Sequence, residues 1–241
     1  MPGIRFPNRH TTTVEARPRF GLLASSGPGI RLLTAGLDLI FPPRCAGCGR
    51  VDARWCDRCQ RDLEQVACLA RERIVDGLDG AATTGVHEGV LQTAIHALKY
   101  ENVPELAQTL AARMEQVIVQ LDWQIDMIAP VPLHTTRLEE RGYNQSQLIG
   151  DQLARRLNSM CLPEALERSR NTPSQVGLNA QERKMNVSDA FHALPELVSG
   201  RHILLVDDVL TTGATLQACA EAARAAGAAA VYGLTVSTAR D

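Results

Sequence analysis

One stretch near the carboxyl end of the chain joins an apolar run, two adjacent carboxylates and a threonine-rich turn. Residues 203–206 are Ile-Leu-Leu-Val, and Asp207 and Asp208 follow them directly. A run that is apolar at every position is typical of a strand buried on both faces of a parallel sheet. Such sheets bind their ligands at the carboxyl ends of the strands. The stretch therefore predicts an α/β fold with a binding site where this strand ends.

A helix is expected after this strand and a short turn. Residues 216–226 are mostly alanine with apolar, Glu and Arg neighbours, and Gly227 ends the run as a left-handed cap would. Backbone N–H groups at a helix start suit a phosphate, as do threonine hydroxyls, and Gly213 allows close approach of the backbone. The carboxylates would accept hydrogen bonds from sugar hydroxyls or hold a hydrated Mg²⁺. The candidate cradle comprises Asp207, Asp208, Val209, Leu210, Thr211, Thr212, Gly213, Ala214 and Thr215.

This cradle resembles the loop that binds 5-phosphoribosyl 1-pyrophosphate (PRPP) in type I phosphoribosyltransferases. In those enzymes two acidic residues take the ribose 2′- and 3′-hydroxyls, and the threonine-rich turn takes the 5′-phosphate. The alternative is a plain Mg²⁺ site, as in receiver domains or in the Walker B strand of a nucleotidase. It is disfavoured because the chain lacks a Gly-x-x-x-x-Gly-Lys-Ser/Thr loop, and because a bare Asp pair does not account for the Thr-Thr-Gly-Ala-Thr turn.

A second motif lies in the first quarter of the chain and consists of four cysteines in two Cys-x-x-Cys pairs. They are Cys45, Cys48, Cys56 and Cys59. Each pair can form a knuckle that points both sulfurs at one metal, and Gly47 and Gly49 relieve the turn. We expect Zn²⁺, with an iron–sulfur cluster or disulfides as alternatives; no secretory signal points to an oxidising compartment. Four cysteine ligands leave no open coordination position, so the expected role is structural.

Length and composition agree with one α/β domain and a small module. The chain has 241 residues, is 45% hydrophobic and carries a formal net charge of −2, which argues against a surface that is basic throughout. No apolar run reaches the ~18 residues of a membrane span, so we expect a cytoplasmic protein without membrane insertion. The predicted division is a disordered extension over residues 1–28, a helix plus the four-cysteine module over 29–76, and a phosphoribosyltransferase-like domain over 77–241.

Apolar periodicity and turn residues predict the elements of these parts. Strands are expected at residues 81–86, 127–133, 203–206 and 230–237. Helices are expected at residues 30–40, 60–70, 88–99, 104–121, 144–157 and 214–226, with a polar connection at 171–187. Alternation of strands and helices predicts a parallel sheet flanked by helices.

The order of the motifs resembles the ComF/GntX family over roughly residues 30–240. The resemblance is carried by the four-cysteine module, Leu98-Lys99-Tyr100, Pro130-Val131-Pro132-Leu133, Arg141-Gly142-Tyr143-Asn144-Gln145-Ser146 and the Asp-Asp loop. It implies a type I phosphoribosyltransferase fold behind a zinc-finger-like module. It also implies a link to the uptake of single-stranded DNA in naturally transformable bacteria.

The resemblance further implies how the rest of a PRPP site is built. The pyrophosphate loop corresponds to Val131, Pro132, Leu133 and His134, and a longer loop at 170–186 is expected to close over the reaction. Arg141, Arg183 and Lys99 are the predicted catalytic cations, which would stabilise pyrophosphate as it leaves C1 of the ribose. Their alternative is an ordinary role as surface charges. Residues 144–146 are expected to cap a helix, and no catalytic histidine is predicted.

Two classes of function fit these residues. The first is a Mg²⁺-dependent phosphoribosyltransferase that acts on an unidentified nucleophile. The second is a non-catalytic PRPP-sensing adaptor that binds single-stranded DNA or a helicase partner. The DNA expectation follows from the resemblance alone, because acids nearly neutralise the bases between residues 137 and 184 and Tyr143 is the only aromatic residue there. The predicted cofactors are a structural Zn²⁺ and Mg²⁺ bound with PRPP.

Overall fold

The structure of the chain is a computed structural model that describes residues 42–51, 53–168 and 190–240. Three predictions concern segments outside this range. They are the extension over residues 1–28, the helix over 30–40 and the loop over 170–186, which includes Arg183.

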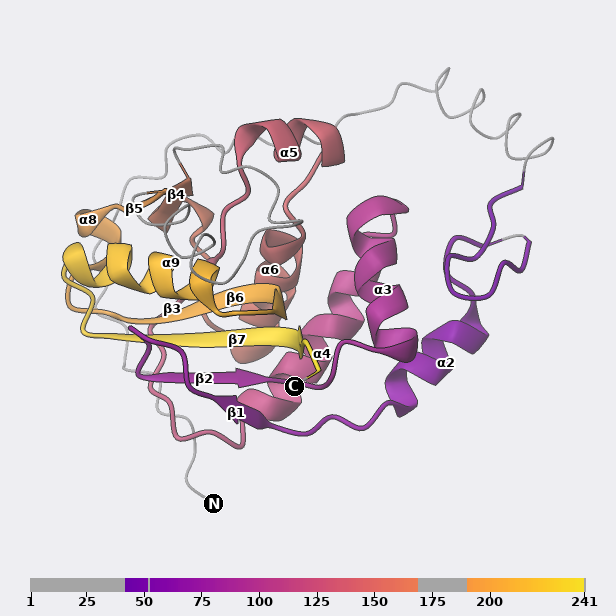
Figure 1. Cartoon of the computed structure of the whole chain (residues 1–241), viewed down its shortest axis with the longest axis horizontal. Helices are drawn as coiled ribbons and strands as arrows, with labels where there is room; N and C mark the ends of the chain where they lie inside the picture. The colour runs from indigo at the N-terminus through magenta and orange to yellow at the C-terminus, as the bar shows by residue number, and fades with distance from the viewer. Residues whose placement is uncertain (1–41, 52, 169–189, 241) are drawn as a thin grey trace.

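A five-stranded sheet in the order β1-β2-β7-β6-β3 forms the centre of the molecule (Figure 1). Its strands are β1 (Arg71–Arg73), β2 (Gly80–Thr83), β3 (Met127–Pro130), β6 (His202–Leu210) and β7 (Ala230–Thr238). Strands β2, β7, β6 and β3 run parallel, and β1 joins the edge antiparallel to β2. The predicted α/β class with a largely parallel sheet is confirmed, and the carboxyl ends of the parallel strands share one edge.

Strand β6 runs past the predicted end at residue 206. Asp207 pairs in register with Thr235 of β7, and Val209 pairs with Ser237. The ladder continues because β7 is equally long and its backbone groups need partners. Both carboxylates of the motif therefore belong to the strand itself, and the turn begins at Thr211.

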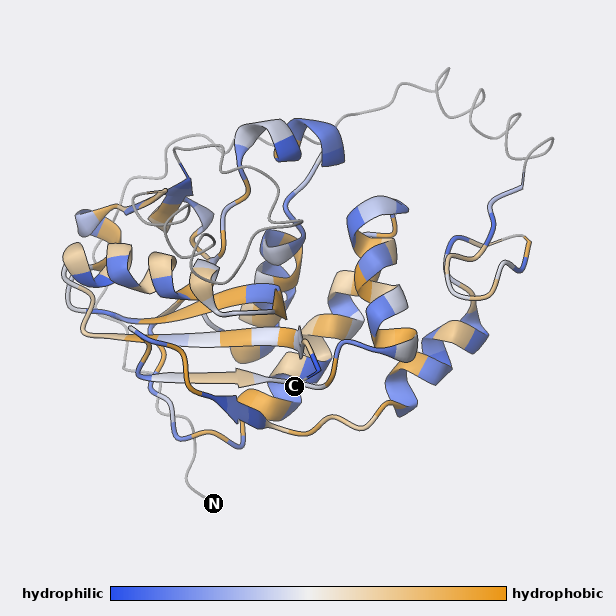
Figure 2. Ribbon diagram, in the orientation of Figure 1, coloured by the Kyte–Doolittle hydropathy of each residue, from blue (hydrophilic) through white to orange (hydrophobic). Residues whose placement is uncertain are grey.

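Helices cover both faces of the sheet. The longer ones are α2 (Asp57–Gln65), α3 (Gly89–Tyr100), α4 (Leu106–Ile118), α5 (Thr135–Arg141), α6 (Gln145–Leu157) and α9 (Ala214–Ala225). One core lies between the sheet and α3, α4 and α6, where β6 contributes Leu204 and Val206. The other lies between the sheet and α9, where β6 contributes Ile203 and Leu205. Strand β6 is thus buried on both faces, as its apolar run predicts, and it carries hydrophobic colour in Figure 2.

A short antiparallel pair lies beside the α9 layer. It consists of β4 (Leu166–Arg168), which follows a single 3-10 turn η1 (Pro163–Ala165), and β5 (Phe191–Ala193), which precedes the one-turn helix α8 (Pro195–Val198). Within the described ranges, no helix combines the length and apolar character needed to cross a membrane.

Most long elements match their predicted ranges, and the exceptions have physical causes. Gly227 follows α9 with φ of +92°, as expected of a left-handed glycine cap. Helix α5 was not predicted because it buries none of its residues and so has no apolar period. The predicted helix at 60–70 begins earlier, at Asp57 inside the second cysteine pair, and ends at Gln65.

The cysteine module and the α/β domain share one core. Leu63 of α2 is fully buried in the same cluster as the apolar residues of α3 and α4. Arg113 of α4 is 3% exposed and donates to the carbonyls of Val66 at 2.7 Å, Ala67 at 3.1 Å and Thr84 at 3.4 Å. Strand β1 also precedes the predicted boundary at residue 77 yet belongs to the sheet. The chain from α2 to β2 is therefore fixed to the domain by burial and by one guanidinium.

Replacing Arg113 by Met should lower the free energy of unfolding by about 3 kcal/mol, because three carbonyl oxygens, one of them on the buried Thr84, would lose a charged donor. The measurement is denaturant unfolding followed by circular dichroism. The matched control is Arg156→Met, which removes a partly exposed ion pair with Glu115 and should cost less than about 1 kcal/mol. Equal losses in the two variants would contradict a special role for Arg113.

Candidate functional site

The two carboxylates at the end of β6 are held by different neighbours. Asp207 is half-buried, and its Oδ1 accepts hydrogen bonds from Ser146 Oγ at 2.8 Å and from the Asp208 backbone N–H at 2.9 Å. Burial raises the pKa of Asp207, and the neighbouring charge of Asp208 raises it further, against the opposing effects of Lys99 and Ser146. The site therefore concentrates negative charge that a ligand or cation can relieve.

Asp208 is almost fully buried and only half satisfied. Its Oδ1 lies 2.7 Å from the Nζ of Lys99, with the two side chains 5% and 20% exposed. Its Oδ2 is buried and has no hydrogen-bond partner within the described part of the chain. Because buried polar atoms are nearly always paired in proteins, this oxygen points to a missing donor. A sugar hydroxyl or a metal-bound water would supply one.

The turn after β6 has the features of an anion cradle. Thr211 and Thr212 are exposed, and Gly213 caps α9 with φ of +81°. A Cβ at Gly213 would lie 3.0 Å from Cγ1 of Val75, so a larger residue would strain the backbone and force the Val75 side chain to shift. The first N–H groups of a twelve-residue helix thus follow the carboxyl end of β6 directly. The Thr212 Oγ1 accepts from the Ala214 N–H at 3.4 Å, and its hydroxyl hydrogen can still donate to a ligand.

The loop after β3 is tied to this site through the start of α6. The side chain of Asn144 accepts from the Ser146 N–H at 3.0 Å and donates to the carbonyl of Val131 at 2.9 Å. The helix cap predicted at residues 144–146 is confirmed. The same residues also make hydrogen bonds to neighbouring parts of the site. Asn144 holds the candidate pyrophosphate loop while Ser146 holds Asp207. His134, the last residue of that loop, caps α5 by accepting from the Thr136 N–H at 3.2 Å.

Two of the predicted cations line one cavity of about 310 Å³ beside the acidic pair. Its lining residues are Lys99, Tyr100, Arg137, Glu140 and Arg141. The guanidinium of Arg141 donates to Gln145 and lies 5.0 Å from the centroid of the Tyr100 ring. The structure thus brings together Lys99 and Arg141, while Arg183 lies outside the described residues.

A histidine that the sequence reasoning set aside also lies at this edge. His87 follows β2, and its Nδ1 is 2.9 Å from Ser237 Oγ at the end of β7. Burial lowers the pKa of His87, and the charge of Lys99 lowers it further, while Asp208 acts in the opposite direction. The ring is therefore a neutral neighbour of the acidic pair at neutral pH. Its position depends on a parallel contact of Val86 with Thr238, for which the sequence carries no signal.

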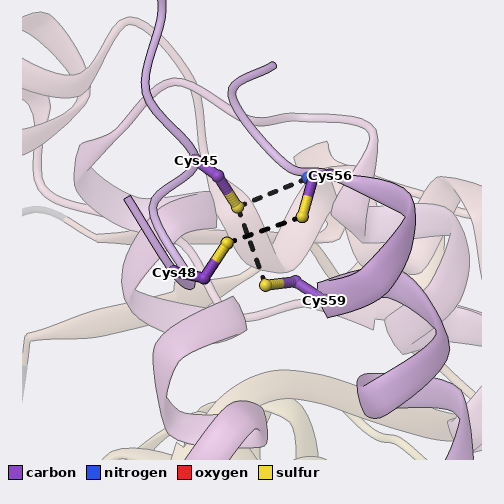
Figure 3. A group of neighbouring side chains, drawn as sticks. All are labelled: Cys45, Cys48, Cys56 and Cys59. Carbon is purple, nitrogen blue, oxygen red and sulfur yellow. Dashed lines mark hydrogen bonds between the residues drawn. The ribbon is translucent and has the colours of Figure 1, made fainter. Parts of the chain in front are cut away.

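The four cysteines of the second motif form one cluster (Figure 3). Cys45 and Cys59 have sulfurs 3.7 Å apart, and Cys48 and Cys56 have sulfurs 3.6 Å apart. Zn–S bonds of about 2.3 Å in a tetrahedron require edges of ~3.8 Å, whereas a disulfide requires about 2.05 Å. The spacing fits one tetrahedral ion and not disulfides. An iron–sulfur cluster would hold the sulfurs farther apart, because several ions would lie among them.

The charges of these thiols also call for a cation. Burial opposes ionisation of Cys45, yet its pKa is lowered because backbone N–H groups of Cys56, Cys48 and Gly47 donate to its sulfur. Burial raises the pKa of Cys59, and the neighbouring thiols raise it further. Four sulfurs this close cannot all ionise without a positive partner. The residues therefore fit Zn²⁺, which would bind all four thiolates in a closed structural site.

The comparisons with known proteins agree with this geometry. A family model described as "Phosphoribosyl transferase domain" matches residues 144–239, from the cap of α6 to the end of β7. The chain is 34% identical over 202 residues to "DNA utilization protein YhgH" of Escherichia coli, covering 78% of this chain and 85% of that protein. It is 30% identical over 197 residues to "Competence protein F" of Haemophilus influenzae, covering 76% and 85%.

Solved structures share a lower similarity. An adenine phosphoribosyltransferase matches with a TM-score of 0.39 and 19% identity over 76% of this chain and 90% of that chain. A glutamine PRPP amidotransferase from Bacillus subtilis matches with a TM-score of 0.40 and 19% identity over 56% and 26%.

Replacing Gly47 by Ala should reduce the zinc content of the purified protein well below one ion per chain. A Cβ at Gly47 would lie 2.6 Å from Cys59 Sγ, so the sulfur would have to leave its position. Zinc is measured by elemental analysis. Cys68→Ser, which changes a cysteine outside the cluster, is the control and should keep its zinc. Full zinc in the Gly47 variant would contradict a tightly closed site.

Two substitutions at Asn144 should separate the contributions that its two hydrogen bonds make to stability. Asn144→Ser keeps an oxygen that can cap α6 but loses the donor to Val131, whereas Asn144→Ala loses both. We expect the alanine variant to be less stable than the serine variant by about 1 kcal/mol, the usual worth of a helix cap. Thermal unfolding measures the difference. Equal stabilities would mean that the cap contributes nothing here.

Proposed function

Because this chain belongs to the ComF family, together with DNA utilization protein YhgH and competence protein F, we propose that it binds PRPP with Mg²⁺ and serves in DNA uptake. The observation that carries the proposal is the buried Asp208 at the carboxyl end of β6, whose Oδ2 has no donor among the residues that the structure describes. The site also contains a second carboxylate and, just after the strand, a hydroxyl-rich helix start. This combination suits a sugar phosphate better than a bare cation.

Each chemical group of PRPP would contact a different part of the site. The ribose 2′- and 3′-hydroxyls would donate to Asp207 and Asp208, whose carboxylates accept only. The 5′-phosphate would lie on the turn from Thr211 to Thr215, where N–H groups and hydroxyls are available. The pyrophosphate would lie against the loop Val131–His134 and the cavity lined by Lys99 and Arg141. The topology supports these assignments, because β3 and β6 run parallel and the loops that follow them lie at the same end of the sheet.

Catalysis in such a site would consist of displacing pyrophosphate from C1 of the ribose. The C1–O bond breaks, its electron pair leaves with pyrophosphate, and the acceptor forms the new bond to C1. Mg²⁺, when bound with the ligand, supplies positive charge to the leaving group. The chain's own contribution is electrostatic: Lys99 and Arg141 offset the negative charge that develops on pyrophosphate, and the carboxylates hold the ribose.

The role in DNA uptake follows from the names of the relatives, which speak of DNA utilization and competence. A catalytic protein and a PRPP-sensing adaptor both need the same ribose site. They differ in whether PRPP is consumed. Single-stranded DNA and a helicase remain candidate partners of the adaptor function, with the zinc module as a candidate contact surface.

Isothermal titration calorimetry with PRPP tests the proposal. The wild-type protein should bind PRPP in a saturable manner that depends on Mg²⁺. Asp207→Asn combined with Asp208→Asn should abolish binding, because amides neither hold Mg²⁺ well nor accept from both hydroxyls at full strength. The matched control is Asp62→Asn, which changes an exposed acid of α2. Unaltered affinity in the double variant, with its fold checked by circular dichroism, would refute the assignment.

Release of pyrophosphate distinguishes an enzyme from an adaptor. A catalyst should form pyrophosphate from PRPP when a pool of candidate acceptors is added, and Arg141→Gln should slow this reaction by at least about tenfold. An adaptor should bind PRPP without consuming it and change its affinity for single-stranded DNA. Labelled PRPP and a fluorescent oligonucleotide measure the two outcomes in the same sample.

A further inference from the structure

Five residues around the candidate site form a closed circuit of hydrogen bonds. The Val131 N–H donates to the carbonyl of Val206 at 2.9 Å, and the carbonyl of Val131 accepts from Asn144 Nδ2 at 2.9 Å. The Oδ1 of Asn144 accepts from the Ser146 N–H at 3.0 Å, and Ser146 Oγ donates to Asp207 Oδ1 at 2.8 Å. Asp207 directly follows Val206 in β6, which closes the circuit. It therefore joins the loop after β3, the start of α6 and the end of β6.

Burial and local sequence make this circuit stiff. Four of its members are no more than 9% exposed, namely Val131, Asn144, Ser146 and Val206. Hydrogen bonds away from water are electrostatically stronger than exposed ones, and bonds in a chain polarise one another. Prolines on both sides of Val131 further restrict the loop, because a proline ring fixes φ. The circuit thus holds Val131 and Asp207 at a fixed separation.

Asn144 is the member of the circuit whose residue type is most restricted. A helix cap alone can be provided by Ser, Thr or Asp. An amide side chain accepts through its oxygen and donates through its nitrogen. Asn144 uses both atoms, the oxygen toward α6 and the nitrogen toward the loop after β3. A carboxylate here would cap the helix but could not donate to Val131. This side chain therefore connects the helix with the loop as well as capping the helix.

The two ends of the circuit lie where the proposed function places two different groups of one ligand. Asp207 would accept from the ribose, and the loop that begins at Val131 would hold the pyrophosphate. PRPP joins these groups covalently through its C1–O bond, so both can bind at once only if the two parts of the site are correctly separated. Ribose 5-phosphate and pyrophosphate, as separate molecules, have no such requirement. A preorganised separation therefore favours the intact ligand.

We infer that Asn144 and Ser146 are positioning residues that determine specificity for intact PRPP over its two hydrolysis products, ribose 5-phosphate and pyrophosphate. This inference rests on the proposed function, since it takes PRPP as the ligand. Neither side chain needs to touch the ligand. Asn144 acts through Val131, and Ser146 acts through Asp207. Because the bonds form one closed circuit, a break at either residue releases the same constraint.

The test compares three ligands across variants of the full-length protein. PRPP, ribose 5-phosphate and pyrophosphate are titrated separately by calorimetry, all with Mg²⁺. The variants are Asn144→Ser, which keeps an oxygen for the helix cap, Ser146→Ala and the two combined, each checked by circular dichroism. The matched control is Ser159→Ala, which removes a buried hydroxyl just beyond the other end of α6. Within the described residues this hydroxyl has no hydrogen-bond partner, so the control should change none of the affinities.

The measured quantity is the excess loss of PRPP affinity. It is the factor by which PRPP binding weakens, divided by the product of the factors for ribose 5-phosphate and pyrophosphate. We expect an excess of at least about fivefold in each single variant, because only the linked ligand depends on the separation. The double variant should show the same excess as either single variant, since one break already opens the circuit.

A second measurement follows the circuit in the protein without ligand. The Val131 amide is the N–H between two prolines, and it donates to Val206. Ser146→Ala should speed hydrogen exchange at this amide by at least about fivefold, the effect of one lost hydrogen bond elsewhere in the same cooperative unit. Nuclear magnetic resonance measures the exchange, and Ser159→Ala should leave it unchanged.

The contrary results are distinct. An excess near one, with PRPP weakened only as much as its two halves together, means that each residue supports one part of the site and overturns the inference. Excess losses that multiply in the double variant do the same. If the wild-type protein binds none of the three ligands, the proposed function fails. Hydrogen exchange at Val131 then decides by itself whether the circuit acts as one unit, and an unchanged rate in Ser146→Ala shows that it does not.

Discussion

Burial of β6 on both faces is the constraint on which the rest of the structure depends. Its apolar residues alternate between two cores, one under α3, α4 and α6 and the other under α9. This central position requires partners on both sides, which β3 and β7 supply in parallel register. It also places Asp207 and Asp208 at the carboxyl end of the parallel strands, where such sheets bind their ligands. The site is thus a consequence of how the core is packed.

Placing two adjacent carboxylates at the end of a buried strand is energetically unfavourable, and residues from several elements offset this. Ser146 from α6 supports Asp207, and Lys99 from α3 supports Asp208. Asn144 fixes the loop after β3 through the same helix start. The support is incomplete, because one oxygen of Asp208 has no donor among the described residues. A partly satisfied network of this kind is poor for stability and suited to binding a ligand that completes it.

The cysteine cluster is joined to this architecture more closely than a separate module would be. Helix α2 begins within the second cysteine pair and sends Leu63 into the main core. Arg113 then fixes the chain that leaves α2 by donating to consecutive carbonyls. A metal that orders the cysteines would therefore also hold α2 against α3 and α4. The four sulfurs lie close enough together to hold one metal ion, and four thiolate ligands would leave that ion no open position for chemistry.

The sequence by itself determined those features that short segments encode: the strand before the Asp pair, the helix that Gly227 ends, the cap at Asn144 and the metal-binding spacing of the cysteines. These depend on local periodicity, turn chemistry and ligand spacing, which neighbouring residues fix. Only the tertiary structure decided that Lys99 meets Asp208, that Ser146 meets Asp207 and that His87 meets Ser237. Those contacts join residues far apart in the chain. They depend on strand order and on which helix covers which face, and no local pattern records either.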